Sequence, residues 1–336
     1  MLLVSISVGS IARAQDDPGA YMTAISQAHV EMNQKYMAYM SAVAHGRRAR
    51  KVEKLRQQAL TSIMTSRDKT AMLPLFKGDN SLRKSSMDYI SFCYNVFNED
   101  YAKIVNMEEI AEQSIDQMEA FILLQEKTTE KIRQASDKMN TASKDFANKN
   151  NVKLVETSSE LSEMIEKANK LTHYVNRMYL PFFKCNFQQS KMVDFMNNNK
   201  VNDIEQARTA LLKYANEGLG ELDSLRSFEG DGSLVTVTRQ LLQFYKKTAE
   251  TTAPKMLDFF LKKDSFEKLK KSFEMKSNHS KEEVDAYNAG VRDINNASNQ
   301  YNTLNENTNQ MHKQLLENWE NAQKTFADNH MPHYKA

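Results

Sequence analysis

The chain has 336 residues, which is enough for one large domain or two medium ones. It contains only 9 Gly and 5 Pro, whereas average usage would give about 23 Gly and about 17 Pro. Turns and strand ends consume these residues, so the composition indicates long helices. The 45 basic and 43 acidic residues give a net charge of +2, which excludes the strong positive field of a nucleic-acid-binding protein.

The first residues have the pattern of an export signal. Residues 2–8 form a short apolar run, and Ala12-Arg13-Ala14 places small residues at the −3 and −1 positions of a cleavage site. We therefore expect a signal peptide over 1–14, whose basic start would lie upstream of Met1. The alternative is a buried N-terminal helix, against which Gly9 and the polar residues after Ala14 argue. Export predicts a location at the cell surface or in the periplasm of a bacterium.

The next part of the chain reads as four helices near 19–45, 50–71, 81–104 and 107–148. Asn106 and Glu109 have the spacing of a capping box and predict the start of the fourth helix. That helix carries a stripe with strict 3-4 spacing, which is typical of helices that wrap around neighbours. The stripe consists of Met118, Phe121, Gln125, Thr128, Ile132, Ala135, Met139, Ala142 and Phe146.

The remaining part predicts a second set of helices near 158–183, 201–218, 233–261 and 281–328, with a short helix near 264–276. We expect Pro181 to lie at a helix end, because proline cannot continue the backbone hydrogen bonds of a helix. For the same reason we expect Pro254 to cause a kink or break near Thr252. Ser280 and Glu283 predict the cap of the last helix. Its stripe consists of Tyr287, Val291, Ile294, Ser298, Tyr301, Asn305, Thr308, His312, Leu315, Trp319, Ala322 and Phe326.

The two sets of helices look like copies of one unit. Residues 73–82 match residues 225–234 at an offset of 152, in a shared Phe-x-Gly-Asp-x-Ser-Leu turn. An offset of 143 upstream pairs Tyr36 with Tyr179, and an offset of 180 downstream pairs Phe146 with Phe326. The changed offsets predict insertions near 184–200 and 262–283. We therefore expect an all-α fold of two tandem, elongated, antiparallel four-helix bundles from an internal duplication, with repeats at 15–150 and 151–336.

Polar residues interrupt both stripes. A polar layer inside a bundle can bind a ligand or fix the register of the helices. Alternatively the stripe of the last helix drifts, so that Leu304 and Met311 face inward. The candidate polar seam consists of Gln125, Thr128, Asn305, Thr308 and His312.

The sequence lacks the patterns that carry known chemistry. None of the seven histidines follows a Glu by three residues, which argues against a ferritin-like di-iron centre. His330 and His333 are close in sequence, but Pro332 prevents the helix that would aim them at one ion. Phosphate-binding loops and nucleophile motifs are also missing. We therefore predict no catalytic residue, no cofactor and no metal, and leave open whether Cys93 and Cys185 form a disulfide.

Three features together resemble an uncharacterised family of exported, all-helical bacterial surface proteins. They are the paired turns at 73–82 and 225–234, the Tyr-Asn pairs at 287–288 and 301–302, and the ending Phe326-x-x-x-His330-x-Pro332. The resemblance implies a surface-associated helical protein and supplies no functional residues.

The predicted function follows from export, helicity and the missing chemistry. We expect a non-enzymatic protein that binds a protein partner or an envelope component, or that has a structural role there. We expect no nucleic acid as partner and no membrane span, because no later segment reaches the roughly 20 apolar residues that a span needs. The alternatives are a binding module for a small or apolar ligand held between helices, and an enzyme on an unfamiliar helical scaffold.

Overall fold

The structure is a computed structural model, which describes residues 16–45, 49–154 and 159–334. The predicted signal peptide over 1–14 lies outside the described residues. The described residues form helices and, apart from two isolated bridges, no strand. The predicted all-α class is therefore confirmed. The helices are α2 (Pro18–Ala44), α3 (Ala49–Ala71), α4 (Ser81–Asn95), η1 (Val96–Asp100), α5 (Tyr101–Ala111), α6 (Ile115–Lys149), α7 (Glu160–Asn197), α8 (Val201–Asp223), α9 (Ser233–Lys247), η2 (Thr248–Thr252), α10 (Ala253–Glu274) and α11 (Lys281–His330).

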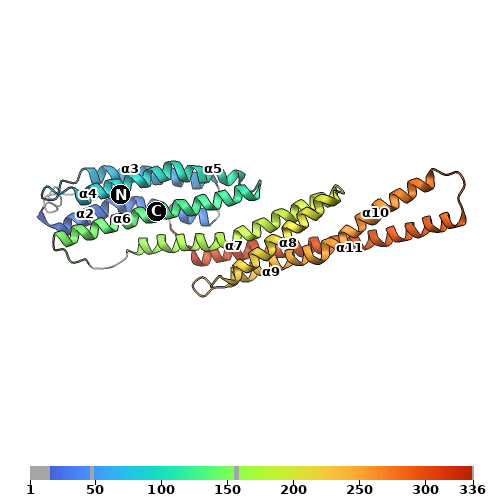
Figure 1. Ribbon diagram of the computed structural model, residues 1–336. Helices are drawn as coiled ribbons and strands as arrows, with labels where there is room; N and C mark the ends of the chain where they lie inside the picture. The colour runs from blue at the N-terminus through green and yellow to red at the C-terminus, as the bar shows by residue number, and fades with distance from the viewer. Residues whose placement is uncertain (1–15, 46–48, 155–158, 335–336) are drawn as a thin grey trace. The chain divides into compact units, whose positions relative to one another are not determined.

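The chain divides into two compact units. Unit 1 comprises residues 1–173 and 327–336, and unit 2 comprises residues 174–326. In unit 1, α2, α3, α4 with α5, and α6 lie side by side (Figure 1). In unit 2, α8 and α9 pack with α7 and α11 (Figure 1). The limit between the repeats predicted at 150/151 stays a prediction.

The same tight turn occurs in both units. In unit 1, Phe76 and Asp79 exchange backbone hydrogen bonds of 3.1 and 2.8 Å around Lys77 and Gly78, which both have positive φ angles. In unit 2, residues 228–231 repeat this arrangement, again with positive φ at both central positions. Glycine tolerates this conformation and the residue before it does so at some cost. The Asp79 carboxylate then accepts from the Ser81 amide at 2.7 Å and caps the next helix.

An aromatic trio packs behind each turn. Tyr21, Phe76 and Phe146 meet in unit 1 with ring centroids 5.2–5.7 Å apart. The trio of Tyr174, Phe228 and Phe326 meets in unit 2 at 5.2–6.0 Å. Tyr174 therefore occupies the place of Tyr21, at an offset of 153.

This pairing corrects the predicted offset of 143. At an offset of 153, the end of α2 at Ala44 corresponds to the end of α7 at Asn197, so the insertion predicted near 184–200 is wrong. The helix predicted to end at 183 continues through Pro181. An interior proline ordinarily costs about 3 kcal/mol. The second half of α7 remains helical because its apolar face is buried, at Phe182, Phe183, Cys185, Met192 and Met196.

Pro181 packs against a glycine of the neighbouring helix. A Cβ added at Gly218 would lie 2.8 Å from the Pro181 Cβ and 3.0 Å from a methyl carbon of Leu242. The sequence indicated that Gly218 ends its helix, but α8 continues to Asp223. The glycine therefore allows a close approach of two helices.

A short π-helix follows α4 in unit 1 and α9 in unit 2. Near Thr252, where the sequence predicted a kink or break, the chain stays helical and forms the short π-helix η2, and η1 lies 152 residues earlier. A π-helix disturbs the regular ladder of backbone hydrogen bonds. Arg56 donates to the Phe97 carbonyl at 2.8 Å, and Arg208 donates to the Ala249 carbonyl at 3.1 Å.

The predicted stripes agree with burial. Every member of the stripes in α6 and α11 is buried or half-buried, whereas Met311 is 50% exposed, so the alternative in which Met311 faces inward is wrong. Ser280 and Glu283 form the predicted capping box, with hydrogen bonds of 3.2 and 3.0 Å. The cap predicted at Asn106 is wrong. Instead, the Ser114 hydroxyl accepts from the Gln117 amide at 3.2 Å and starts α6.

Candidate functional site

The candidate polar seam is divided between the two units. Gln125 and Thr128 belong to unit 1, and Asn305, Thr308 and His312 belong to unit 2. Thr128 is fully buried, and its hydroxyl has no hydrogen-bond partner among the residues that the structure describes. The Thr308 hydroxyl donates to the carbonyl of Leu304 in its own helix at 2.6 Å. Of the three in unit 2, His312 forms a hydrogen bond with a side chain of another helix, Tyr245 of α9.

His312 belongs to a polar cluster inside unit 2. Its Nε2 lies 2.9 Å from the Tyr245 hydroxyl, which also donates to Asn186 Oδ1 at 3.1 Å. The ring stacks on Phe244 at 5.5 Å between centroids. Burial lowers the pKa of His312 to about 4 and raises the pKa of Tyr245 well above its ordinary value. Both groups are therefore neutral at pH 7, which suits a satisfied polar core better than acid–base chemistry.

Unit 1 contains a comparable pair. His29 Nε2 lies 2.7 Å from the hydroxyl of Ser86, and both side chains are buried. Burial lowers the pKa of His29 to about 4. In unit 2 the position of Ser86 is taken, 152 residues later, by Thr238, which accepts from the indole N–H of Trp319 at 3.1 Å. These polar pairs join helices within each unit.

The two cysteines are buried thiols. Cys93 and Cys185 are buried and neither is in a disulfide. Burial raises the pKa of Cys93 to about 12 and also raises that of Cys185. A nucleophilic or metal-binding cysteine needs the thiolate form, so neither cysteine is a candidate catalytic residue.

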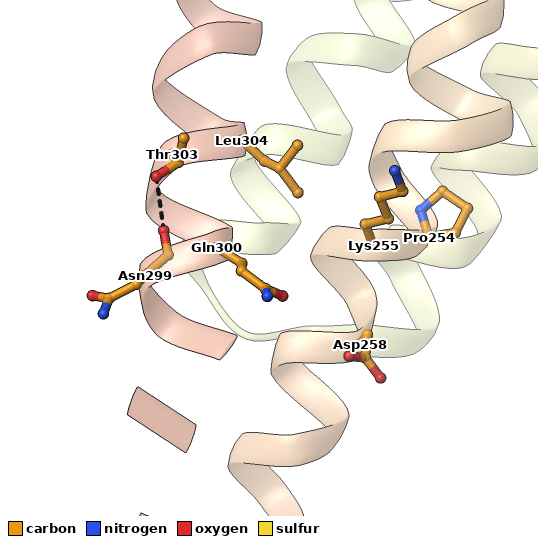
Figure 2. A pocket seen from close by; sticks show the side chains of 7 residues that line it. All are labelled: Pro254, Lys255, Asp258, Asn299, Gln300, Thr303 and Leu304. Atoms are coloured by element: carbon orange, nitrogen blue, oxygen red, sulfur yellow. Dashed lines mark hydrogen bonds between the residues drawn. The ribbon is translucent and has the colours of Figure 1, made fainter. Parts of the chain in front are cut away.

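A groove in unit 2 lies between the start of α10 and the middle of α11 (Figure 2). It has a volume of about 830 Å³, and its lining comes from Pro254, Lys255, Asp258, Asn299, Gln300, Thr303 and Leu304. Gln300 and Leu304 point from α11 towards α10 (Figure 2). Apart from half-buried Leu304, every lining residue is exposed. Binding pockets for small molecules bury most of their ligand against apolar walls, so this open polar groove is a weak candidate for one.

Beyond this groove, α10 and the first part of α11 continue as a two-helix hairpin, which we call the arm (residues 261–296). It runs past the loop that joins α7 and α8 (Figure 1). No residue from 261 to 296 is buried. The segments on either side are different, because Phe260 and Ala297 are each only 5% exposed.

The arm is held together by a thin aromatic seam. Phe273 stacks on His279 and on Tyr287, with ring centroids 3.7 and 4.4 Å apart. Phe266 approaches Tyr287 at 5.8 Å and packs against Gly290, where an added Cβ would lie 3.1 Å from its ring. All of these side chains remain half-buried because two helices alone cannot enclose them.

The arm also carries apolar side chains outside its seam. Leu261 is 56% exposed, Met275 is 73% exposed and Val284 is 37% exposed. Sequence reasoning placed an insertion near 262–283 but assigned no function to it. The signal that could have identified the arm is the extra helical stretch in the second set, which has no counterpart in the first.

The chain has no match among models of known protein families, curated proteins or solved structures. Among the residues that the structure describes, no helix has the length and apolar character required to cross a bilayer. The resemblance to exported surface proteins therefore stays a prediction from the sequence.

Proposed function

We propose that this chain is a non-catalytic helical-bundle protein that binds a protein partner through the arm. The observation that carries the proposal is the absence of any buried residue from 261 to 296. Folded chains ordinarily bury the apolar stripe of an amphipathic helix. A hairpin that leaves its stripe half-exposed indicates that another molecule completes the packing.

The chemistry of the arm specifies the partner as a protein with an amphipathic helix. A third helix laid along the seam would bury the half-exposed rings of Phe266, Phe273 and Tyr287, and burial of aromatic surface contributes strongly to binding. Lysines outnumber acidic residues on the α10 side, at Lys262, Lys263, Lys268, Lys270 and Lys271. Lys262, Lys268 and Lys270 pair with carboxylates of α10 itself, so Lys263 and Lys271 carry the positive charge that a partner would meet. We therefore expect acidic residues on the flank of the partner helix that faces α10.

The proposal that the protein is not an enzyme is supported by its buried polar groups. The histidines and tyrosines with large pKa shifts are held neutral by burial, and the cysteines are held as thiols. A binding role through a surface fits these observations better than catalysis does.

We also infer that the two units arose by duplication of one helical unit. The tight turns, the π-helices and the arginines that donate to them recur at an offset of 152. The arm is then the part of the second copy that the first copy lacks, which supports a specialised role for it.

Export to a bacterial cell envelope is part of the proposal and rests on residues 1–14. Protease treatment of intact cells, with a periplasmic protein as control, tests the location. Release of arm peptides while the periplasmic control stays intact supports a surface protein. Peptides that appear only after the outer membrane is opened support a periplasmic one, and peptides that appear only after cell lysis contradict export.

The test of partner binding uses two matched triple variants of the full chain. Leu261→Ser, Met275→Ser and Val284→Ser remove exposed apolar side chains from the arm. The control replaces three exposed apolar residues of unit 1, with Met64→Ser, Met72→Ser and Leu123→Ser. Crosslinking in intact cells should recover a partner with the wild type and with the control, and at least about tenfold less of it with the arm variant.

Two outcomes would contradict the proposal. One is the recovery of no partner by the wild type, and the other is equal recovery by both variants. If the recovered species is a second copy of this chain, the arm is a self-association surface. If native mass spectrometry instead finds a small-molecule adduct that is lost on Leu304→Ser, the ligand-binding alternative replaces the proposal.

A further inference from the structure

The C-terminal end of α2 and the segment after α11 meet within unit 1. Pro332 prevents a further helical turn, and Met331 is only 3% exposed. The backbone N–H of Tyr334 donates to the Ser41 hydroxyl at 3.2 Å. These contacts hold the ring of His333 against the ring of His45, with centroids 4.1 Å apart and an interplanar angle of 24°.

The hydrogen bond of His45 fixes which nitrogen carries its proton in the neutral ring. Nδ1 lies 2.6 Å from the Ser41 carbonyl oxygen. A carbonyl can only accept, so Nδ1 carries the hydrogen and Nε2 presents a lone pair. A hydrogen bond from the second ring nitrogen to a backbone carbonyl is the usual arrangement for a histidine that binds a metal.

Among the described residues, the lone pair of His45 has no hydrogen-bond partner. The His45 side chain is only 7% exposed, and its Nε2 is a buried atom. The nearest carboxylate oxygen, Oδ1 of Asp328, lies 3.8 Å away, too far for a hydrogen bond. A buried polar atom without a partner is costly, and here it faces a second imidazole and a carboxylate.

We propose that His45, Asp328 and His333 bind one divalent transition-metal ion, with zinc as the preferred ion. One possible ligand atom from each residue lies within 4.8 Å of the other two. Two imidazoles and one carboxylate form a ligand set that zinc accepts, with water in the fourth position. Proteins use the same ligand types for other first-row metals, so metal competition belongs to the test.

To hold the ion, the three ligand atoms must move closer together, and the His333 ring must rotate out of its stack on His45 so that both imidazole lone pairs point at one ion. Zinc–ligand bonds of about 2.0–2.1 Å in a tetrahedral site place the ligand atoms roughly 3.3 Å apart. His45 is fixed by its bond to Ser41, whereas Asp328 and His333 are exposed and can adjust. The bound ion would then tie the C-terminal segment to the end of α2, independently of the arm and its partner.

The experiment measures zinc binding to the full chain, produced without a histidine tag and stripped of metal with a chelator. Competition with a zinc-sensitive dye gives the affinity, and native mass spectrometry gives the stoichiometry. The matched control is His173→Ala. His173 is exposed and its Nδ1 lies 3.1 Å from Glu126 Oε1, so it is a histidine–carboxylate pair without a third ligand.

We expect one zinc ion per chain, and at least about tenfold weaker binding in both His333→Ala and Asp328→Asn. His173→Ala should bind zinc as the wild type does. Both test positions are exposed, so these variants should fold, and circular dichroism verifies it. X-ray absorption of the zinc complex should show two imidazole nitrogens, which His333→Ala reduces to one.

The proposal is overturned if the wild type binds no zinc, or if both test variants bind it as the wild type does. Loss of affinity in His173→Ala alone would place an adventitious ion at the exposed pair. If nickel or copper binds more tightly than the usual order of affinities predicts, the proposed site stands, but its preferred ion is that metal and not zinc.

Discussion

Units 1 and 2 share their framework up to the π-helix and diverge after it. In unit 1, the helix after η1 ends at Ala111 and packs into the bundle, with Tyr101, Ile104 and Ala111 all buried. In unit 2, the helix after η2 continues to Glu274 and pairs with α11 as an arm without a buried residue. The same local framework therefore supports a closed bundle in one unit and an open surface in the other.

This difference between the units shows which features both bundles share and which feature occurs in unit 2 alone. Both units keep the tight turn, the aromatic trio and the arginine that donates to the π-helix. Unit 1 forms these features without an arm, so the bundle does not need one. This comparison supports a functional role for the arm, and the variants below test whether the shared features are equivalent.

The largest effect is expected at the arginines of the π-helices. Arg56 donates to the carbonyl of Phe97, and its side chain is only 9% exposed. Arg56→Met leaves that carbonyl without its donor and should lower the free energy of unfolding by about 3 kcal/mol. Chemical denaturation measures the loss, and hydrogen exchange locates it in unit 1.

The matched variant in unit 2 is Arg208→Met. The Arg208 side chain is 21% exposed and its bond to the Ala249 carbonyl is longer, at 3.1 Å. Water can replace part of this interaction, so the loss should be clearly smaller and located in unit 2. Equal losses of unfolding free energy in the two variants would contradict this prediction, because they would show that burial does not distinguish the two arginines.

A medium effect is expected from the buried histidine of unit 1. The pKa of His29 is about 4 in the folded chain against an ordinary value of 6.5. The unfolded chain therefore binds the proton more readily, and stability falls as the pH drops from about 6.5 towards 4. Between pH 7 and pH 5 this residue should remove roughly 2 kcal/mol.

His29→Gln should abolish that part of the acid sensitivity, as denaturation at the two pH values would show. His312→Gln is the corresponding change in unit 2, where the pKa is likewise lowered to about 4 by burial. An unchanged pH dependence in His29→Gln would show that other groups cause the acid sensitivity.

The smallest effect is expected at the glycines of α8. Gly218→Ala places a Cβ against Pro181, and this overpacking should outweigh the better helix propensity of alanine, for a net loss of about 1 kcal/mol. Gly220→Ala meets nothing within 4 Å and should gain up to about 1 kcal/mol. Thermal unfolding of both variants gives the signs, and a stabilised Gly218→Ala would show that the helices separate at little cost.

Much of the fold could be predicted because helices can be recognised in a sequence from the spacing of their apolar residues and from their capping residues. The stripes ending at Phe146 and Phe326 are buried or half-buried along their whole length, and the Ser280 cap forms as expected. The end of α7 could not be predicted from Pro181, because the burial of residues beyond the proline outweighs its local cost. The offset of 143 was wrong because it paired Tyr36 with Tyr179. Only the ring contacts in the structure show that Tyr174 is the counterpart of Tyr21.

The candidate sites were harder to predict because they depend on proximity. His333 was weighed as a metal ligand only with His330, its neighbour in sequence. The structure instead stacks it on His45, almost the whole chain away. The residues of the candidate polar seam are buried or half-buried. Sequence spacing could not show that its members belong to separate units or that Thr308 bonds within its own helix.

The division of the chain has a consequence for biosynthesis. Unit 1 combines the first helices with residues 327–334, and the whole of unit 2 lies between them in the sequence. The residues that contact the end of α2, among them His333 and Tyr334, are therefore the last described residues to leave the ribosome. Unit 2 can fold during synthesis once Phe326 has emerged, whereas unit 1 stays open at that edge until synthesis reaches the C-terminal segment. A chaperone that holds nascent chains would consequently meet the end of α2 uncovered for most of translation.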